Sequence, residues 1–276
     1  MALKDLLVLV DNQPSAAARI AAAAQVAARN DAHLTGLYVI GQGPLPAYIE
    51  AELPESVRIT QREVEMEQAQ AARDLFDDAM RRFGLTDRSE WRVVRGHPTD
   101  VAAVHGRYAD LVVVGQPDPR RERDIPVALP EDLLFECGRP LLVVPYAGHW
   151  DSIGERIVVG WNASREAARA VGDAMPLLSR AARVTIMAVN PKGVLGDEPG
   201  ADIARHLSRH GCRVEAAHVT TEQVDPGDMM LNTVADESAD LVVMGAYGRS
   251  RLRELVLGGM TRHMLQHMTV PVLMSH

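Results

Sequence analysis

Short, mostly apolar runs recur along the chain, separated by longer amphipathic or alanine-rich stretches, and the first of them, residues 6–10, has no polar interruption. In the first half these runs cover residues 6–10, 34–40, 91–94, 110–114 and 141–144. A run of this kind is typical of a strand that is buried on both faces of a parallel sheet. The stretches between the runs predict helices over residues 14–30, 55–83, 99–108 and 130–136. Strands that alternate with helices predict a parallel sheet with helices on both faces and right-handed crossovers.

The longest predicted helix, residues 55–83, also shows which of its faces should be buried. Apolar side chains recur at helical spacing toward its end, at Ala72, Leu75, Phe76, Ala79 and Phe83. Gly84 follows at once, and glycine is the commonest residue just past the end of a helix. We therefore expect this apolar stripe to pack inward and the helix to end at Gly84.

The second half repeats the order of the first. Its apolar runs cover residues 156–162, 184–189, 214–219, 239–244 and 271–274, and its predicted helices cover 164–180, 201–210, 226–236 and 262–268. The sharpest internal match sets ADLVVVG at Ala109–Gly115 against ADLVVMG at Ala239–Gly245. The sequence therefore predicts an α/β protein of two tandem domains, residues 1–147 and 153–276. Each should hold a five-stranded, twisted parallel sheet between helices.

Charge and composition restrict the possible partners. The net charge is −8 and the pI is about 5.7, which argues against general nucleic-acid binding because such proteins usually present a basic surface. The two cysteines, Cys137 and Cys212, give neither a disulfide framework nor the spacing of metal ligands. The first apolar run ends at Asp11, too early for a signal peptide or a membrane span. We therefore expect a cytoplasmic protein that binds neither nucleic acid nor membrane.

The stretch Gly245–Thr261, GAYGRSRLRELVLGGMT, carries the strongest sign of ligand chemistry. It connects a predicted buried strand to a predicted helix, and glycines lie at both of its ends. Glycines permit tight turns and close approach to a ligand, and the start of a helix favours an anion. Arg249, Arg251 and Arg253 stand between the glycines, with Glu254 as the only acid of the stretch. The stretch therefore predicts a phosphate site.

This stretch resembles the ATP-binding motif of the universal stress protein family, which runs Gly, two residues, Gly, nine residues, Gly, then Ser or Thr. Gly245, Gly248 and Gly258 match it, whereas Gly259 stands where the hydroxyl residue is expected and Thr261 lies two residues further on. The doubling resembles the tandem form of the same family. The resemblance implies a Rossmann-like fold of the adenine-nucleotide alpha hydrolase kind, bound ATP with Mg²⁺, and a role as a stress-response regulator. It also implies that the final strands of the two domains pair into an intramolecular pseudo-dimer, and it leaves a homodimer of chains open.

The same resemblance assigns residues to the nucleotide. An Asp after the first strand and an apolar residue at the end of the second approach the adenosine in the family, and Asn162 and Val189 hold these positions here. Asn162 has a second interpretation as a turn or helix-capping residue, since Asn favours both. A pocket lined by Met, Val and Trp side chains would not distinguish ATP from GTP or cyclic AMP. The remaining candidate site residues are Met244, Gly245, Gly248, Arg249, Gly258, Gly259, Met260 and Thr261.

The first half keeps an aspartate, Asp11, at the end of its first strand but lacks the glycines. After Gly115 no glycine appears until Gly138, and Glu131 and Asp132 stand at the start of the predicted helix. Carboxylates there already satisfy the helix dipole and would repel a triphosphate. We therefore expect this half to bind no ATP in this way and to act as a scaffold or regulatory domain.

Other candidate chemistry is weaker. His263 and His267 share a face of the last predicted helix, and we expect both to face solvent because most metal sites need three or four ligands. No catalytic residue is predicted. Two alternatives to the ATP-binding regulator stay open: a nucleotide-independent scaffold of the same fold that binds a protein partner, and a slow ATP-hydrolysing enzyme. The sequence does not identify the protein partner in any of these cases.

Overall fold

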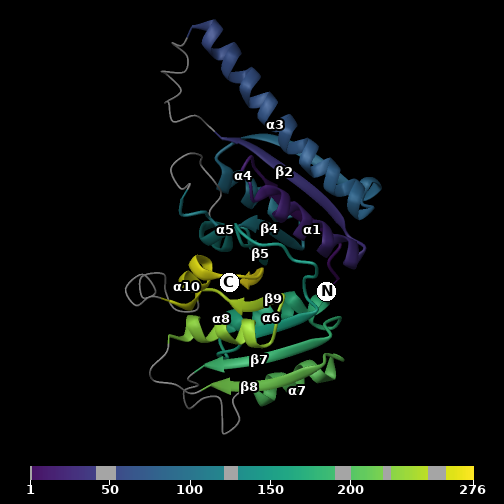
Figure 1. Cartoon of the computed structure of the whole chain (residues 1–276), viewed down its shortest axis with the longest axis vertical. Helices are drawn as coiled ribbons and strands as arrows, with labels where there is room; N and C mark the ends of the chain where they lie inside the picture. The colour runs from purple at the N-terminus through teal and green to yellow at the C-terminus, as the bar shows by residue number, and fades with distance from the viewer. Residues whose placement is uncertain (1, 42–53, 121–129, 190–199, 220–224, 248–258) are drawn as a thin grey trace.

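The computed structural model describes residues 2–41, 54–120, 130–189, 200–219, 225–247 and 259–276 (Figure 1). The strands are β1 Asp5–Val10, β2 His33–Gly41, β3 Ser89–Gly96, β4 Leu111–Gly115, β5 Leu141–Val144, β6 Arg156–Gly160, β7 Arg183–Val189, β8 Val214–Val219, β9 Leu241–Gly245 and β10 Val272–Ser275. The helices are α1 Ala16–Asn30, α3 Glu55–Phe83, α4 Pro98–Gly106, α5 Pro130–Glu136, α6 Arg165–Leu178, α7 Ala201–Arg209, α8 Pro226–Asp236 and α10 Met260–His267, with a 3₁₀ turn η1 at Thr86–Arg88.

One ten-stranded sheet runs through both halves, in the order β3-β2-β1-β4-β5-β10-β9-β6-β7-β8 (Figure 1). Among the described strands the pairing is parallel, except that β5 and β10 run antiparallel with Leu142 opposite Leu273. The α/β fold with two five-stranded parallel halves is as predicted, and so is the pairing of the final strands. Each of these two strands covers an edge that the other half would otherwise expose.

Helices cover both faces of the sheet and enclose two cores that continue across the halves. One core gathers side chains from α1, α3, α6 and α7, and the other gathers side chains from α4, α5, α8 and α10. Strand β1 shows the alternation, because Leu6 and Val8 belong to the first core while Leu7 belongs to the second. Burial on both faces explains why central strands such as β4 and β5 are apolar throughout, whereas the edge strand β3 carries charged residues.

Helix α3 has the predicted bounds, and Gly84 ends it in the left-handed conformation at φ 67°. Its buried stripe differs from the prediction at Leu75, which is 42% exposed, while Ala72, Phe76 and Ala79 are buried. At about 100° per residue, Leu75 lies roughly 90° from the centre of that stripe. An apolar residue at the flank of a helical stripe was therefore wrongly assigned to the core.

The repeated ADLVV segment holds the start of a central strand in each half. The carboxylate of Asp110 accepts hydrogen bonds from the backbone N–H groups of Lys4 (2.8 Å) and Asp5 (3.1 Å). Asp240 accepts from the N–H groups of Gly154, Glu155 and Arg156, each at 3.0 Å, and from the hydroxyl of Ser152 at 2.6 Å. The sequence match between the two halves therefore reflects a structural role that Asp110 and Asp240 share.

Several boundaries differ from the prediction by one or two residues. Strand β3 spans Ser89–Gly96, longer than the predicted run, and α10 begins at Met260, two residues before the predicted start. In the described ranges, no helix is both long and apolar enough to cross a bilayer.

Candidate functional site

A pocket of about 240 Å³ opens in the second half at the carboxyl ends of β6 and β9. The first turns of α6, α8 and α10 complete its wall. Ligands of open α/β sheets bind at this edge because the strand ends and helix N-termini converge there. The lining residues are Gly160, Trp161, Asn162, Ser164, Glu166, Met187, Pro226, Met230, Met244, Gly245, Tyr247, Met260 and Thr261.

Half of the predicted site residues meet in this pocket: Asn162, Met244, Gly245, Met260 and Thr261. Gly259 is the N-terminal cap of α10 and directly precedes two of them. Val189 ends β7, but its side chain lies outside the description. Gly248, Arg249 and Gly258 lie outside the described residues, so their predicted roles stay predictions.

Gly245 lets α6 approach the end of β9. A Cβ atom on this residue would lie 2.4 Å from the backbone nitrogen of Ala167 and 2.5 Å from the carbonyl carbon of Glu166. The backbone of Gly245 does not have a positive φ, so a tight turn is not the reason for a glycine at this position. The close approach that Gly245 permits among the described residues is therefore to the first turn of α6.

Asn162 has the turn role of its second interpretation, and its contact with a nucleotide stays a prediction. Its Oδ1 accepts a hydrogen bond from the backbone N–H of Ser164 at 3.1 Å, which makes it a turn residue, and it also lines the pocket. The helix cap is Ser164, whose hydroxyl accepts from the N–H of Ala167. Because the backbone donor fixes Oδ1, the amide group of Asn162 that remains is a hydrogen-bond donor.

Thr261 ties the end of β9 to α10. Its hydroxyl is buried and accepts a hydrogen bond from the backbone N–H of Tyr247 at 3.2 Å. Tyr247 takes the left-handed conformation at φ 54°, which is unusual for a bulky residue. The ring of Phe135, from α5 of the first half, packs against the ring of Tyr247 at 5.2 Å between centroids. The first half thus supports one wall of the pocket.

A buried carboxylate, Glu166, lines the pocket beside the start of α6. Burial opposes its ionisation, but hydrogen bonds from Arg165, from its own backbone N–H and from Ser164, with the charge of Arg165, hold its pKa below the usual value. The group therefore stays ionised and paired near neutral pH. The Glu166 carboxylate is part of the first turn of α6, and in its ionised form it has no proton to donate.

The remaining wall is apolar and was only partly foreseen. Trp161, Met187 and Met230 line the pocket together with Met244, in keeping with the Met and Trp side chains expected around a base. Met187 lies two residues before the end of β7 and was not predicted as a site residue. A signal for it exists in hindsight, because a residue near the carboxyl end of a neighbouring parallel strand faces the same edge of the sheet.

The equivalent place in the first half is filled by an arginine. Gly115 ends β4 as Gly245 ends β9, and a Cβ atom on it would lie 2.2 Å from a terminal nitrogen of Arg19. The Arg19 side chain, 3% exposed, pairs with Asp11 at 2.8 Å. Sequence reasoning predicts no ATP site here because of acids near α5, and the structure adds a guanidinium that lies against the end of β4.

The sequence model of the universal stress protein family matches residues 2–145 and again residues 154–276. The chain belongs to the universal stress protein family. It carries two such domains in tandem, with the Rossmann-like α/β fold that the resemblance implied. Among curated proteins, sequence comparison finds no match to this universal stress protein.

Solved structures resemble this universal stress protein over nearly its full length. A universal stress protein from Archaeoglobus fulgidus aligns with a TM-score of 0.78 at 15% identity, covering 98% of this chain and 95% of the other. A putative universal stress protein from Pseudomonas aeruginosa aligns with a TM-score of 0.61 at 15% identity, covering 99% and 93%. At this identity the likeness supports the fold of the whole chain.

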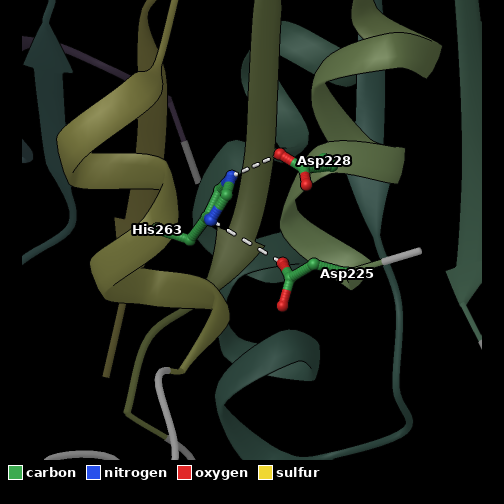
Figure 2. A group of neighbouring side chains, drawn as sticks. All are labelled: Asp225, Asp228 and His263. Atoms are coloured by element: carbon green, nitrogen blue, oxygen red, sulfur yellow. Dashed lines mark ion pairs between the residues drawn. The ribbon is translucent and has the colours of Figure 1, made fainter. Parts of the chain in front are cut away.

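His263 corrects one expectation about side chains outside the pocket. We expected His263 and His267 to face solvent, and His267 is exposed. The His263 side chain is only 21% exposed and lies between the carboxylates of Asp225 and Asp228 (Figure 2). The packing of α10 against α8, which one helix cannot reveal, removes this imidazole from solvent.

Proposed function

We propose that this universal stress protein binds ATP, with Mg²⁺, in its second half and acts in the cytoplasm as a regulator of a stress response. The observation that carries the proposal is the pocket in which Asn162, Met244, Gly245, Met260 and Thr261 meet. These residues come from three separate stretches of the chain, and the resemblance assigned them to one nucleotide before their proximity was known. An apolar pocket with a few polar groups at this edge of the sheet is the usual form of a nucleotide site.

The size of the pocket indicates which part of the nucleotide it would hold. Pockets that enclose a whole small molecule usually measure about 300–1,000 Å³. The 240 Å³ between the described residues suits the nucleoside, with the base against Met187, Met230 and Met244. The phosphates would then extend to the start of α10 and to residues 248–258, which connect Tyr247 to Gly259.

The start of α10 suits an anion better than its counterpart α5. Its first turn has no acidic residue, and its cap, Gly259, has no side chain that could satisfy the free backbone N–H groups. The first turn of α5 carries Glu131 and Asp132. Free N–H groups and the positive end of the helix dipole favour phosphate in the second half only.

Contacts between the halves would allow a nucleotide in the pocket to affect the first half. We assign the first half a scaffold or regulatory role. The Nε2 group of Gln116 donates to the carbonyl of Leu265 in α10 at 2.7 Å. Phe135 packs against Tyr247, which lines the pocket. A ligand that orders this wall would therefore also change the surroundings of α5. A protein partner that recognises the nucleotide-bound state would bind at α5.

Thermal unfolding with and without millimolar Mg-ATP tests the proposal. A ligand that binds only the folded state raises the midpoint, so we expect a rise of several degrees, and a smaller one with adenosine because the phosphate contacts are missing. Gly248→Asp, which places a carboxylate in the glycine loop, should abolish the rise and leave the midpoint of the free protein in place.

Tryptophan fluorescence locates the bound nucleotide. Trp161 lines the pocket, whereas Trp91 packs on Phe76 in the first half at 5.4 Å between ring centroids. We expect Mg-ATP to change the emission of the parent protein and of Trp91→Phe, and to leave that of Trp161→Phe unchanged. A response that persists in Trp161→Phe would place the nucleotide elsewhere.

A nucleotide-independent scaffold is the competing function, and two departures from the family pattern favour it. Asn162 presents an amide donor where the family has a charged acceptor, and Gly259 stands where the family has a hydroxyl residue. The scaffold predicts no change of midpoint and no change of Trp161 emission at any Mg-ATP concentration.

A further inference from the structure

Three side chains with metal-binding groups meet between α8 and α10, beside the pocket (Figure 2). Asp225 caps the start of α8, Asp228 lies in its first turn, and His263 reaches across from α10. The Nε2 atom of His263 lies 3.1 Å from Oδ1 of Asp228, and its Nδ1 atom lies 3.6 Å from Oδ1 of Asp225. One ligand atom from each residue lies within 4.8 Å of the other two.

The contact between His263 and Asp228 does not have the geometry of a hydrogen bond. Nε2 is buried and has no hydrogen-bond partner among the described residues, although the Asp228 oxygen is only 3.1 Å away. That oxygen must therefore lie well off the direction in which the nitrogen points. Two ligand atoms of one metal ion have this arrangement. Each lies about 2.0–2.2 Å from the ion, and the two lie roughly 3.0–3.4 Å apart. The nitrogen lone pair then points at the ion and not at the other ligand.

The absence of a side chain at Gly227 leaves room for the imidazole of His263 against α8. A Cβ atom on Gly227 would lie 2.3 Å from Cδ2 and 2.4 Å from Cγ of His263, so any larger residue would displace the ring. The N–H of Gly227 also donates to Oδ1 of Asp225 at 2.7 Å, which orients that carboxylate. The two helices thus fix the ring and one carboxylate independently of any ion.

We propose that Asp225, Asp228 and His263 bind a divalent transition-metal ion of the Zn²⁺ type. Two carboxylates balance its charge, and the imidazole nitrogen favours such an ion over Mg²⁺ or Ca²⁺, which prefer oxygen ligands alone. Ligand atoms within 4.8 Å of one another need to move by only about 1 Å to share an ion. This site is separate from the Mg²⁺ that accompanies ATP.

The ion would join two helices whose first turns form one wall of the pocket. Pro226 and Met230 line the pocket from α8, and Met260 and Thr261 line it from α10. A bound ion would therefore hold that wall closed on its outer side. Its binding does not depend on whether the pocket takes ATP.

Calorimetric titration of the full chain with Zn²⁺, without affinity tag or nucleotide, tests the proposal. We expect one ion per chain, and we expect His263→Gln and Asp228→Asn each to weaken binding at least about tenfold. Gly227→Ala, which displaces the ring but removes no ligand, should weaken it as well. Circular dichroism confirms that each variant is folded.

A second histidine pair provides the matched control. His206 on α7 and His210 just after its end have the same spacing and a similar ring contact, 4.9 Å between centroids against 4.7 Å for His263 and His267. His206→Gln and His267→Gln should therefore leave Zn²⁺ affinity unchanged.

Two results would overturn the proposal. If His267→Gln removes binding and Asp228→Asn does not, the ion is held by a pair of histidines on one helix. If Zn²⁺ binds no more weakly to His263→Gln than to the parent, or does not bind at all, the three side chains form no metal site and only contact one another.

Discussion

The missing side chain at Gly245 sets the distance between the end of β9 and the first turn of α6. Because the atoms that a Cβ would meet belong to the backbone of Ala167 and Glu166, the clash cannot be relieved by rotating a side chain. The sequence marks this glycine as important but gives a different reason, a ligand or a turn. Segments far apart in the chain make the contact, so no local pattern contains it.

Gly245→Ala should therefore destabilise the protein by about 1–3 kcal/mol, the usual cost of overpacking in a tight core. Gly172→Ala is its control, since a Cβ atom on Gly172 meets nothing within 4 Å and this glycine lies inside α6. Alanine there should stabilise the protein by about 0.5–1 kcal/mol because it lowers the entropy cost of the helix. Urea unfolding measures both, and equal effects of the two changes would refute the packing argument.

Other single residues show the same limit of sequence reasoning. Asn162 and Met244 could be placed at the site because the ends of parallel strands meet at one edge, and Thr261 because it follows the glycine motif of the family. Arg19 and His263 could not, since each acquires its role from a partner on another element. Arg19 looks like one of several arginines in the sequence, and only the fold places it against Gly115.

Among the elements, strands and helices follow closely from the pattern of apolar residues. The bounds of α3, α5, α8 and β5 agree with the prediction because glycine, proline or charge marks their ends. The start of α10 was placed two residues too late, at Arg262 instead of Met260, because the residues between the Gly259 cap and Arg262 carry no charge or proline that would mark the first turn.

The repeated aspartates Asp110 and Asp240 show how one residue fixes the start of an element. Asp240 holds three backbone N–H groups and one hydroxyl at the start of β6, whereas Asp110 holds two N–H groups at the start of β1. A carboxylate that accepts several backbone hydrogen bonds is worth more than a neutral acceptor, because each bond is assisted by its charge.

We expect Asp240→Asn to lower the free energy of unfolding by about 1–3 kcal/mol, and Asp110→Asn by a smaller amount. The amide keeps the size of the side chain but offers one acceptor oxygen and a donor that faces other donors. Urea unfolding of the two variants gives the comparison. A larger loss for Asp110→Asn would show that the hydrogen-bond count does not decide the effect.

At the scale of the whole molecule, the halves are joined by more than the pairing of their final strands. Beyond the β5–β10 pairing, the ends of α1 and α6 exchange contacts: Arg29 donates to the carbonyl of Arg180 at 3.3 Å, and Arg180 donates to the carbonyl of Arg29. Arg29 also pairs with Glu155 at 2.7 Å. Both cores continue across this junction.

The chain should therefore unfold in one cooperative transition. Trp150 contacts both halves, so it is replaced by Phe in both test proteins. In that background Trp91 reports on the first half and Trp161 on the second, so urea unfolding of Trp161→Phe and Trp91→Phe, followed by fluorescence, should give the same profile apart from the effect of each substitution on stability. Arg180→Ala should lower both midpoints together, while Arg205→Ala, which removes only an exposed pair with Asp202, should change stability by no more than about 0.5 kcal/mol. Two separate transitions would show that the halves fold independently.

The pairing of the buried Arg19 with Asp11 has a consequence for how such a chain responds to the concentration of a nucleotide. The first half holds an internal cation at the end of β4, where the second half has a pocket at the end of β9, so we expect the proposed nucleotide to have a single place per chain. A single place saturates along a simple hyperbola, and cooperativity between the halves is ruled out by stoichiometry. Such a protein would report the nucleotide level as a graded signal, and any threshold would have to come from the partner that reads it.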